Sequence, residues 1–204
     1  MKRRSLVFVI GRFLAIPLYK FLFHYKVKGK KNLPKKGAYI VCSNHISNYD
    51  PLLVSMTQKR QIYYMAKAEL FEKKFFAALI SELGAFPVER GAGDGKAIQK
   101  AEEIVSDGRI LGIFIEGTRS KTGEFLRPKS GASMVAFQTK TPVIPVCITS
   151  KNKQIKLFRK VTISWGKPIP FEELGLVNGT PAEFRNASRK IMDEIKKLRE
   201  NDLQ

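Results

Sequence analysis

Short apolar runs alternate with polar turns along most of the chain, and their pattern separates segments of strand character from segments of helix character. Compact apolar runs bounded by turn-forming residues indicate buried strands. The sequence predicts such strands at residues 38–43, 62–65, 109–115, 142–149 and 161–165.

Between these runs, apolar residues recur at helical spacing or follow helix-start signals. The sequence predicts helices at residues 51–57, 69–83, 96–107 and 131–139. A further helix begins at the capping box formed by Thr180 and Glu183, with Pro181 in its first turn. Because the predicted strands alternate with helices, we expect an α/β fold with a mostly parallel or mixed central sheet flanked by helices.

The N-terminal residues 5–23 are apolar almost throughout, but Arg12 and Pro17 interrupt them. A buried charge disfavours a spanning helix, and an internal proline kinks or breaks a single helix. We therefore expect one or two short helices that lie in the membrane interface, with a spanning helix or a buried core helix as the alternatives. This divides the chain into a membrane-anchoring helical segment, residues 1–25, and a main domain, residues 26–204.

The charge of the chain gives information about its binding partner. The chain has 37 basic and 18 acidic residues and a net charge of +19, and no acid precedes Asp50. A second run without acids covers residues 151–160. Such a balance indicates an anionic partner: nucleic acid, an anionic membrane or an acidic protein. The apolar N-terminus favours the membrane, and no nucleic-acid-binding module is recognisable, so we expect no nucleic acid partner.

The two cysteines, Cys42 and Cys147, lie within apolar runs and lack the spacing of metal ligands. They fit reduced core residues, although one disulfide between them is also compatible with the sequence. No metal site is expected.

The stretch S-N-H-I-S-N-Y-D contains candidate chemistry, because His45 follows a predicted strand and Asp50 comes five residues later. On one continuous helix the two side chains would point about 140° apart, but Pro51 starts a new helix and lets the loop fold back. A carboxylate on Nδ1 of His45 would leave Nε2 free as a general base. The alternative is a solvated turn in which Asp50 only caps the following helix. No Gly-x-Ser-x-Gly elbow is present, so such a base would activate a hydroxyl group of the substrate.

Three further stretches occur in order after N-H-I-S-N-Y-D: G-A-F-P-V-E-R at 84–90, F-I-E-G-T-R-S at 114–120 and V-I-P-V at 143–146. Together, the four blocks resemble those of the glycerolipid acyltransferase family, which includes bacterial 1-acyl-glycerol-3-phosphate acyltransferases. The resemblance runs from about residue 26 to residue 165. Ile115 departs from it, because many members have proline before the glutamate, and we expect this to alter loop rigidity rather than chemistry.

The resemblance implies an enzyme that transfers a fatty acyl group to the sn-2 hydroxyl of 1-acyl-glycerol 3-phosphate and gives phosphatidate. The donor would be a thioester of acyl carrier protein or coenzyme A, and no other cofactor is implied. His45 would take the proton of the hydroxyl, and Asp50 would orient the imidazole. The enzyme would be peripheral or monotopic on the cytoplasmic face of the cell membrane. The alternatives are another lysophospholipid or glycerol 3-phosphate as acceptor, or a non-catalytic basic module that binds membrane or nucleic acid.

The block E-G-T-R resembles the acceptor-phosphate block of the family, which implies substrate-binding roles for Glu116, Gly117, Thr118 and Arg119. Backbone N–H groups and the planar Arg119 guanidinium suit phosphate, whereas Glu116 would hold Arg119 or the glycerol in place. Arg90 is the second phosphate candidate from its own block. The alternatives are an ordinary Glu116–Arg119 ion pair and a solvated Arg90.

Two lysines, Lys67 and Lys129, also match positions where the family tends to have basic residues. Either would assist the oxyanion or the phosphate, and a plain surface role is the alternative. The phenylalanine-rich helix at 69–83 would line an acyl groove or belong to the core.

Overall fold

Seven strands form one mixed sheet in the order β1-β7-β6-β2-β5-β3-β4 in the computed structural model, which describes residues 6–88 and 95–204. The strands are β1 (Tyr25–Lys28), β2 (Tyr39–Ser43), β3 (Ile62–Lys67), β4 (Ala85–Val88), β5 (Ile110–Phe114), β6 (Val143–Ser150) and β7 (Val161–Trp165). Strands β6 and β7 pair antiparallel, and the other neighbouring strands pair in parallel. The predicted α/β fold with a mixed central sheet is confirmed.

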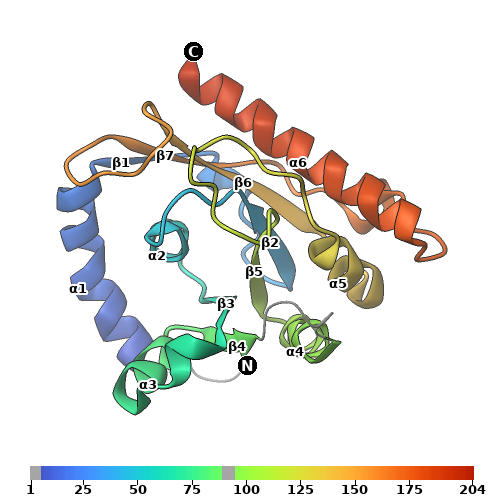
Figure 1. The fold of residues 1–204 in the computed structure, drawn as a ribbon, viewed down its shortest axis with the longest axis horizontal. Helices are drawn as coiled ribbons and strands as arrows, with labels where there is room; N and C mark the ends of the chain where they lie inside the picture. Colours follow the sequence, from blue (N-terminus) through green and yellow to red (C-terminus); the bar gives the residue numbers. More distant parts are fainter. Residues whose placement is uncertain (1–5, 89–94) are drawn as a thin grey trace.

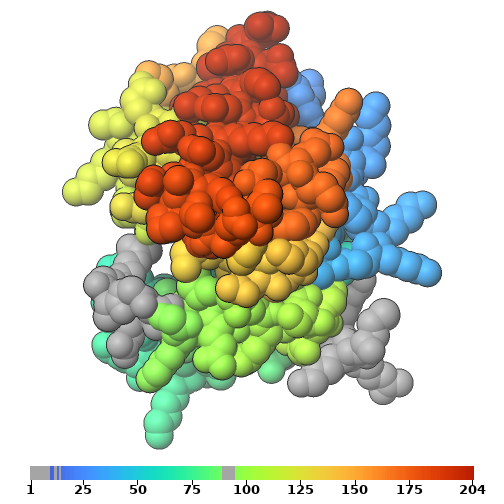
Figure 2. Space-filling model, turned by 90° about the vertical axis from the view of Figure 1, so that its right-hand side faces the viewer, coloured from blue at the N-terminus to red at the C-terminus, as the bar shows by residue number. Residues whose placement is uncertain are grey.

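Helices cover both faces of this sheet (Figure 1). They are α1 (Leu6–Phe23), α2 (Asp50–Met56), α3 (Lys74–Glu82), α4 (Gly95–Ser106), α5 (Gly131–Thr139) and α6 (Pro181–Leu203). Three short 3-10 helices are η1 (Lys30–Asn32), η2 (Ala68–Phe71) and η3 (Phe171–Leu174). Helices α4, α5 and α6 lie on one face, which Figure 2 views directly, and α1 and α2 lie on the other.

The burial of β2 explains why its sequence is apolar on both faces. All five of its residues are buried. Ile40 and Cys42 pack in the core beneath α4, α5 and α6, whereas Tyr39 and Val41 pack in the core on the side of α1 and α2. Burial of such a side chain contributes roughly 1.5–3 kcal/mol to stability. A strand enclosed in this way needs apolar residues at every position, which is the pattern of a central parallel strand.

The position of β2 also determines where a site can form. It lies between β5 and β6, parallel to both, so the loops that leave β2 and β5 emerge at the same edge of the sheet. In open α/β sheets, ligands bind outside the carboxyl ends of the strands. The loop with His45 follows β2, and the loop with Arg119 follows β5.

The helix expected at 69–83 is shorter than predicted, because η2 occupies 68–71 and α3 begins only at Lys74. None of the residues of α3 is buried, and Phe75 is 87% exposed. Its apolar face is therefore not part of the core. The short strands β1 and β4 were not predicted; both lie at the edges of the sheet, where four residues suffice and where Pro87 is tolerated.

Of the one or two helices expected in this segment the structure has one, α1, which continues through Pro17 without a break. Its C-terminal end packs against the loop of His45: the ring centroids of Phe23 and Tyr49 are 4.9 Å apart, and those of Tyr19 and Tyr49 are 6.5 Å apart. Phe13 is 78% exposed. Within residues 6–88 and 95–204, none of the helices combines the length and the apolar character needed to cross a membrane.

Candidate active site

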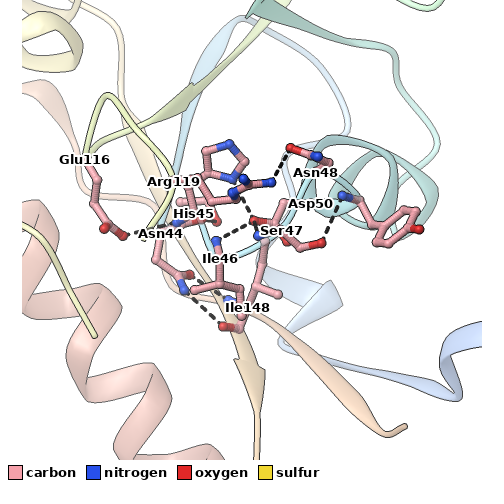
Figure 3. A network of polar contacts seen from close by, with 11 residues as sticks. Asn44, His45, Ile46, Ser47, Asn48, Asp50, Glu116, Arg119 and Ile148 are labelled. Atoms are coloured by element: carbon pink, nitrogen blue, oxygen red, sulfur yellow. Dashed lines mark hydrogen bonds and ion pairs between the residues drawn. The ribbon is translucent and has the colours of Figure 1, made fainter. Parts of the chain in front are cut away.

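The Asp50 carboxylate holds His45 through a tight local loop (Figure 3). Its Oδ2 lies 2.7 Å from His45 Nδ1 and accepts the backbone N–H groups of Ile46 at 2.7 Å and Ser47 at 2.8 Å. The alternative in which Asp50 only caps the following helix is not realised, because Asp50 is the first residue of α2 and Tyr49 is the N-cap. Its carboxylate instead folds back onto the preceding loop, and the expected contact with His45 is present.

This geometry determines which nitrogen of His45 is available for chemistry. An ionised carboxylate only accepts hydrogen bonds, so Nδ1 carries the proton and Nε2 has the free lone pair. The ring stacks on Phe114, with centroids 4.0 Å apart and planes 17° apart. The side chain of Asp50 is fully buried, whereas that of His45 is 14% exposed. The imidazole is therefore held on one side and accessible on the other.

Glu116 does not pair with Arg119, so the expectation that it holds Arg119 in place was wrong. Its carboxylate is buried: Oε1 accepts the backbone N–H of His45 at 3.1 Å, and Oε2 accepts that of Leu126 at 3.0 Å. Burial raises the pKa of Glu116 above its ordinary value, although the hydrogen bonds from Leu126 and His45 oppose this shift. With both oxygens accepting backbone N–H groups, Glu116 joins the loops of the site.

Arg119 points to the other side of its loop and donates from Nη1 to Asn48 Oδ1 at 2.7 Å (Figure 3). Gly117 lies between Glu116 and Arg119, and its φ of 70° is a backbone conformation that other residues rarely adopt. The backbone turns there, so the side chains of Glu116 and Arg119 point in different directions. Thr118 and Arg119 are both exposed. Ser120 N–H donates to His45 O at 2.8 Å and joins this loop to that of His45.

An open hollow of about 560 Å³ lies beside these two loops. It is lined by Ile46, Ser47, Asn48, Tyr49, Arg119, Ser120, Lys121, Gln154 and Ile155. Its volume is within the range of small-molecule sites, roughly 300–1,000 Å³. Two cations and several amide and hydroxyl groups make it suitable for an anionic, hydrogen-bonding ligand.

The other basic candidates are Lys129, Lys67 and Arg90. Lys129 is exposed and close to the E-G-T-R loop, since a Cβ at Gly117 would lie 3.1 Å from Lys129 Cγ. Lys67 is exposed at the carboxyl end of β3 and makes no hydrogen bond to His45 or Asp50. Arg90 lies outside the described residues.

Sequence reasoning missed three residues that shape the site. Asn44 is fully buried and joins β2 to β6, donating to Ile148 O at 3.0 Å and accepting from Ile148 N at 2.8 Å. Asn48 orients Arg119, and Phe114 supports the ring of His45. Asn44 and Asn48 both lie within the polar stretch around His45, and this proximity in the sequence could have marked them as residues of the site.

A histidine held by a carboxylate, with a basic loop beside it at the carboxyl ends of parallel strands, is an arrangement suited to general-base chemistry. The family model described as Acyltransferase matches residues 24–149, which is more than half of the chain. The chain belongs to this acyltransferase family.

Individual relatives agree with this assignment. The 1-acyl-sn-glycerol-3-phosphate acyltransferase of Bacillus subtilis (strain 168) is 32% identical over 136 residues, which cover 66% of this chain and 67% of the relative. The protein of the same name from Borreliella burgdorferi is 33% identical over 128 residues, covering 62% of this chain and 51% of the relative. The second alignment thus spans about half the length of that relative.

The fold also has a counterpart among solved structures. The crystal structure of the 1-acyl-sn-glycerophosphate (LPA) acyltransferase PlsC from Thermotoga maritima superposes with a TM-score of 0.73 and 23% sequence identity. The match covers 100% of this chain and 85% of the other. At this identity the likeness supports the fold.

Proposed function

We propose that the protein transfers a fatty acyl group from a thioester of acyl carrier protein or coenzyme A to the sn-2 hydroxyl of 1-acyl-glycerol 3-phosphate, forming phosphatidate. The observation that carries this proposal is the 2.7 Å contact between His45 Nδ1 and Asp50 Oδ2, which leaves Nε2 free in a loop whose next residues line a basic hollow. The proposed acceptor is the one in the names of the two relatives, which are 1-acyl-sn-glycerol-3-phosphate acyltransferases.

In the proposed reaction, His45 Nε2 removes the proton of the acceptor hydroxyl while its oxygen attacks the thioester carbonyl. The tetrahedral intermediate collapses, the C–S bond breaks, and the imidazolium returns the proton to the leaving thiolate. Asp50 stabilises the imidazolium and keeps the ring in place. Such general-base help is typically worth about 10²–10⁴ in rate. No acyl-enzyme forms, and no other cofactor is needed.

For substrate binding, we propose that Arg119 binds the acceptor phosphate together with the backbone of Gly117 and Thr118. Arg119 is exposed at the hollow and already oriented by Asn48. Arg90 and Lys67 remain proposed further ligands of the phosphate or oxyanion. Lys129 is better supported than Lys67, because it lies against Gly117.

We also propose that residues 1–25 anchor the catalytic domain, residues 26–204, on the cytoplasmic face of the membrane. The exposed apolar side chains of α1 support this, as Phe13 is 78% and Phe21 66% exposed. An interfacial helix inserts such side chains at the level of the lipid headgroups.

The test is release of free thiol from acyl-coenzyme A, with and without lysophosphatidate. The wild-type protein should release thiol only when the acceptor is present. His45→Ala should lower this rate by about 10²-fold or more while the protein remains folded, because the base is lost. Full activity of the variant would refute the mechanism.

Acceptor and donor panels complete this test. Turnover of glycerol 3-phosphate or another lysophospholipid in preference to lysophosphatidate would change the proposed acceptor. Comparison of acyl carrier protein with coenzyme A identifies the donor. Binding to DNA without any thiol release would instead support a non-catalytic basic module.

A further inference from the structure

The loop that joins β6 to β7, residues 151–160, is a basic surface segment that the proposed reaction does not use; it is called the β6–β7 loop below. It contains no acid, and its cations are Lys151, Lys153, Lys156, Arg159 and Lys160. Lys153 forms an ion pair with Glu124. Among the described carboxylates, none forms an ion pair with the other four. The loop therefore presents a local excess of positive charge.

The same loop exposes two large apolar side chains, Leu157 at 47% and Phe158 at 58%. Phe158 has a φ of 60°, a left-handed conformation that is unusual for a bulky side chain. Its N–H donates to Leu22 O, and its ring meets that of Phe21 edge-on, with centroids 5.8 Å apart. Contacts with the end of α1 thus keep an aromatic ring exposed in a strained conformation, which is a feature of functional sites.

The β6–β7 loop lies beside both α1 and the candidate active site. Its orange trace reaches the upper end of α1 in Figure 1, in agreement with the contacts of Phe158. Two of its other residues, Gln154 and Ile155, line the hollow that also contains Asn48 and Arg119. One segment therefore touches both the exposed apolar surface of α1 and the wall of the substrate hollow.

We propose that the β6–β7 loop is a second membrane contact, which binds an anionic bilayer beside α1 and brings the hollow to the level of the headgroups. Leu157 and Phe158 enter the interface next to Phe21, and the exposed cations bind anionic headgroups. The cations alone would also suit nucleic acid, but the exposed apolar pair favours lipid. The inference rests on the proposed function, in which the acceptor is a lipid.

The first experiment measures partition of the full chain onto phosphatidylglycerol vesicles. Asparagine tolerates the left-handed region, so Phe158→Asn relieves strain and leaves the melting temperature unchanged or higher. Loss of the inserted ring should weaken partition about tenfold. The matched control is Val177→Asn, since Val177 is 76% exposed in the segment before α6 and should leave partition unchanged.

The second experiment neutralises charge in Lys156→Gln combined with Arg159→Gln. Each basic residue near an anionic surface is worth about a fivefold change in binding, so the pair should weaken partition about thirtyfold. The control is Lys35→Gln combined with Lys36→Gln, a pair that is exposed in the turn before β2, at the opposite end of that strand from His45. Uncharged phosphatidylcholine vesicles should abolish the difference between these two double variants.

Unchanged partition of both loop variants would overturn the inference. An equal loss in the Lys35 and Lys36 control would overturn it as well, because the effect would then reflect net charge. Loss of DNA binding without loss of vesicle binding would assign the loop to nucleic acid. Turnover of a soluble short-chain lysophosphatidate is measured in parallel: its absence in the wild-type protein would refute the proposed function, while vesicle partition still decides the role of the loop.

Discussion

Glu116 joins three segments around the candidate active site through its two carboxylate oxygens. It accepts from the backbone of His45 after β2 and from that of Leu126 in the loop beyond E-G-T-R. Its own position follows β5. The carboxylate therefore fixes the position of the His45 loop relative to the loop that follows β5.

At the scale of single residues, the variant Glu116→Gln should lower the turnover of the enzyme. The amide NH₂ of glutamine must face one of the two backbone N–H donors, which leaves a buried donor unpaired and costs about 1–3 kcal/mol. We expect a loss of about 10- to 100-fold in kcat/KM, measured by acceptor-dependent thiol release. Activity equal to wild type would show that the distance between the loops does not depend on this carboxylate.

The pH dependence of stability tests the same residue independently. Because burial raises the pKa of Glu116, the folded protein retains its proton at a pH where the unfolded chain has lost it. The unfolding free energy of wild type relative to Glu116→Gln should therefore fall as pH rises above the ordinary glutamate pKa, about 4.3. Denaturant titrations between acidic and neutral pH measure this difference, and an opposite slope would contradict the assigned direction.

At the scale of elements, the end of α6 is fastened to the sheet by one buried carboxylate. The side chain of Asp202 is 1% exposed and pairs with Lys28 Nζ at 2.8 Å. It also accepts from Ser164 Oγ at 2.8 Å on β7 and from Thr149 Oγ1 at 3.0 Å on β6. This contact holds the last turn of α6 against two strands and the residue that ends β1.

Asp202→Ala should destabilise the protein strongly, because it leaves the two hydroxyl groups and Lys28 without their partner. Each buried hydroxyl group left without its acceptor costs about 1–3 kcal/mol, which urea unfolding would measure. Asp193→Ala is the control, as Asp193 is exposed on the same helix and forms an exposed ion pair with Lys196. It should change stability by about 0.5 kcal/mol or less. Equal effects of both variants would show that α6 is not fastened there.

At the scale of the whole molecule, the core encloses both cysteines between the two helical layers. Cys42 and Cys147 are free thiols with no exposed surface, so the alternative of a disulfide is not realised. Burial raises the pKa of the Cys147 thiol to about 11. Burial also raises the pKa of Cys42, and in its case no other group contributes to the shift.

Neither thiol should react with iodoacetamide in the folded protein at pH 8, since the thiolate is the reactive form. With a pKa near 11, roughly one Cys147 in a thousand is ionised at that pH. Both cysteines should become labelled together when urea unfolds the chain, as followed by mass spectrometry. Rapid labelling of either one under native conditions would show that the core opens locally.

The features that depend on residues close together in the sequence could be predicted from the sequence alone. The buried strands follow from apolar runs, and the contact of His45 with Asp50 lies within one short loop, so residues close in sequence decide it. The capping box at Thr180 and Glu183 is present for the same reason.

Tertiary structure decided the features that depend on residues far apart in the chain. Glu116 binds the backbone of His45 instead of Arg119, because the neighbouring loops of β2 and β5 meet only after the sheet has formed. Helix α3 remains exposed, although its apolar pattern also fits a core helix. An apolar or charged side chain has the same local preference wherever it occurs, and only the packed fold determines whether it meets the core, another loop or the surface.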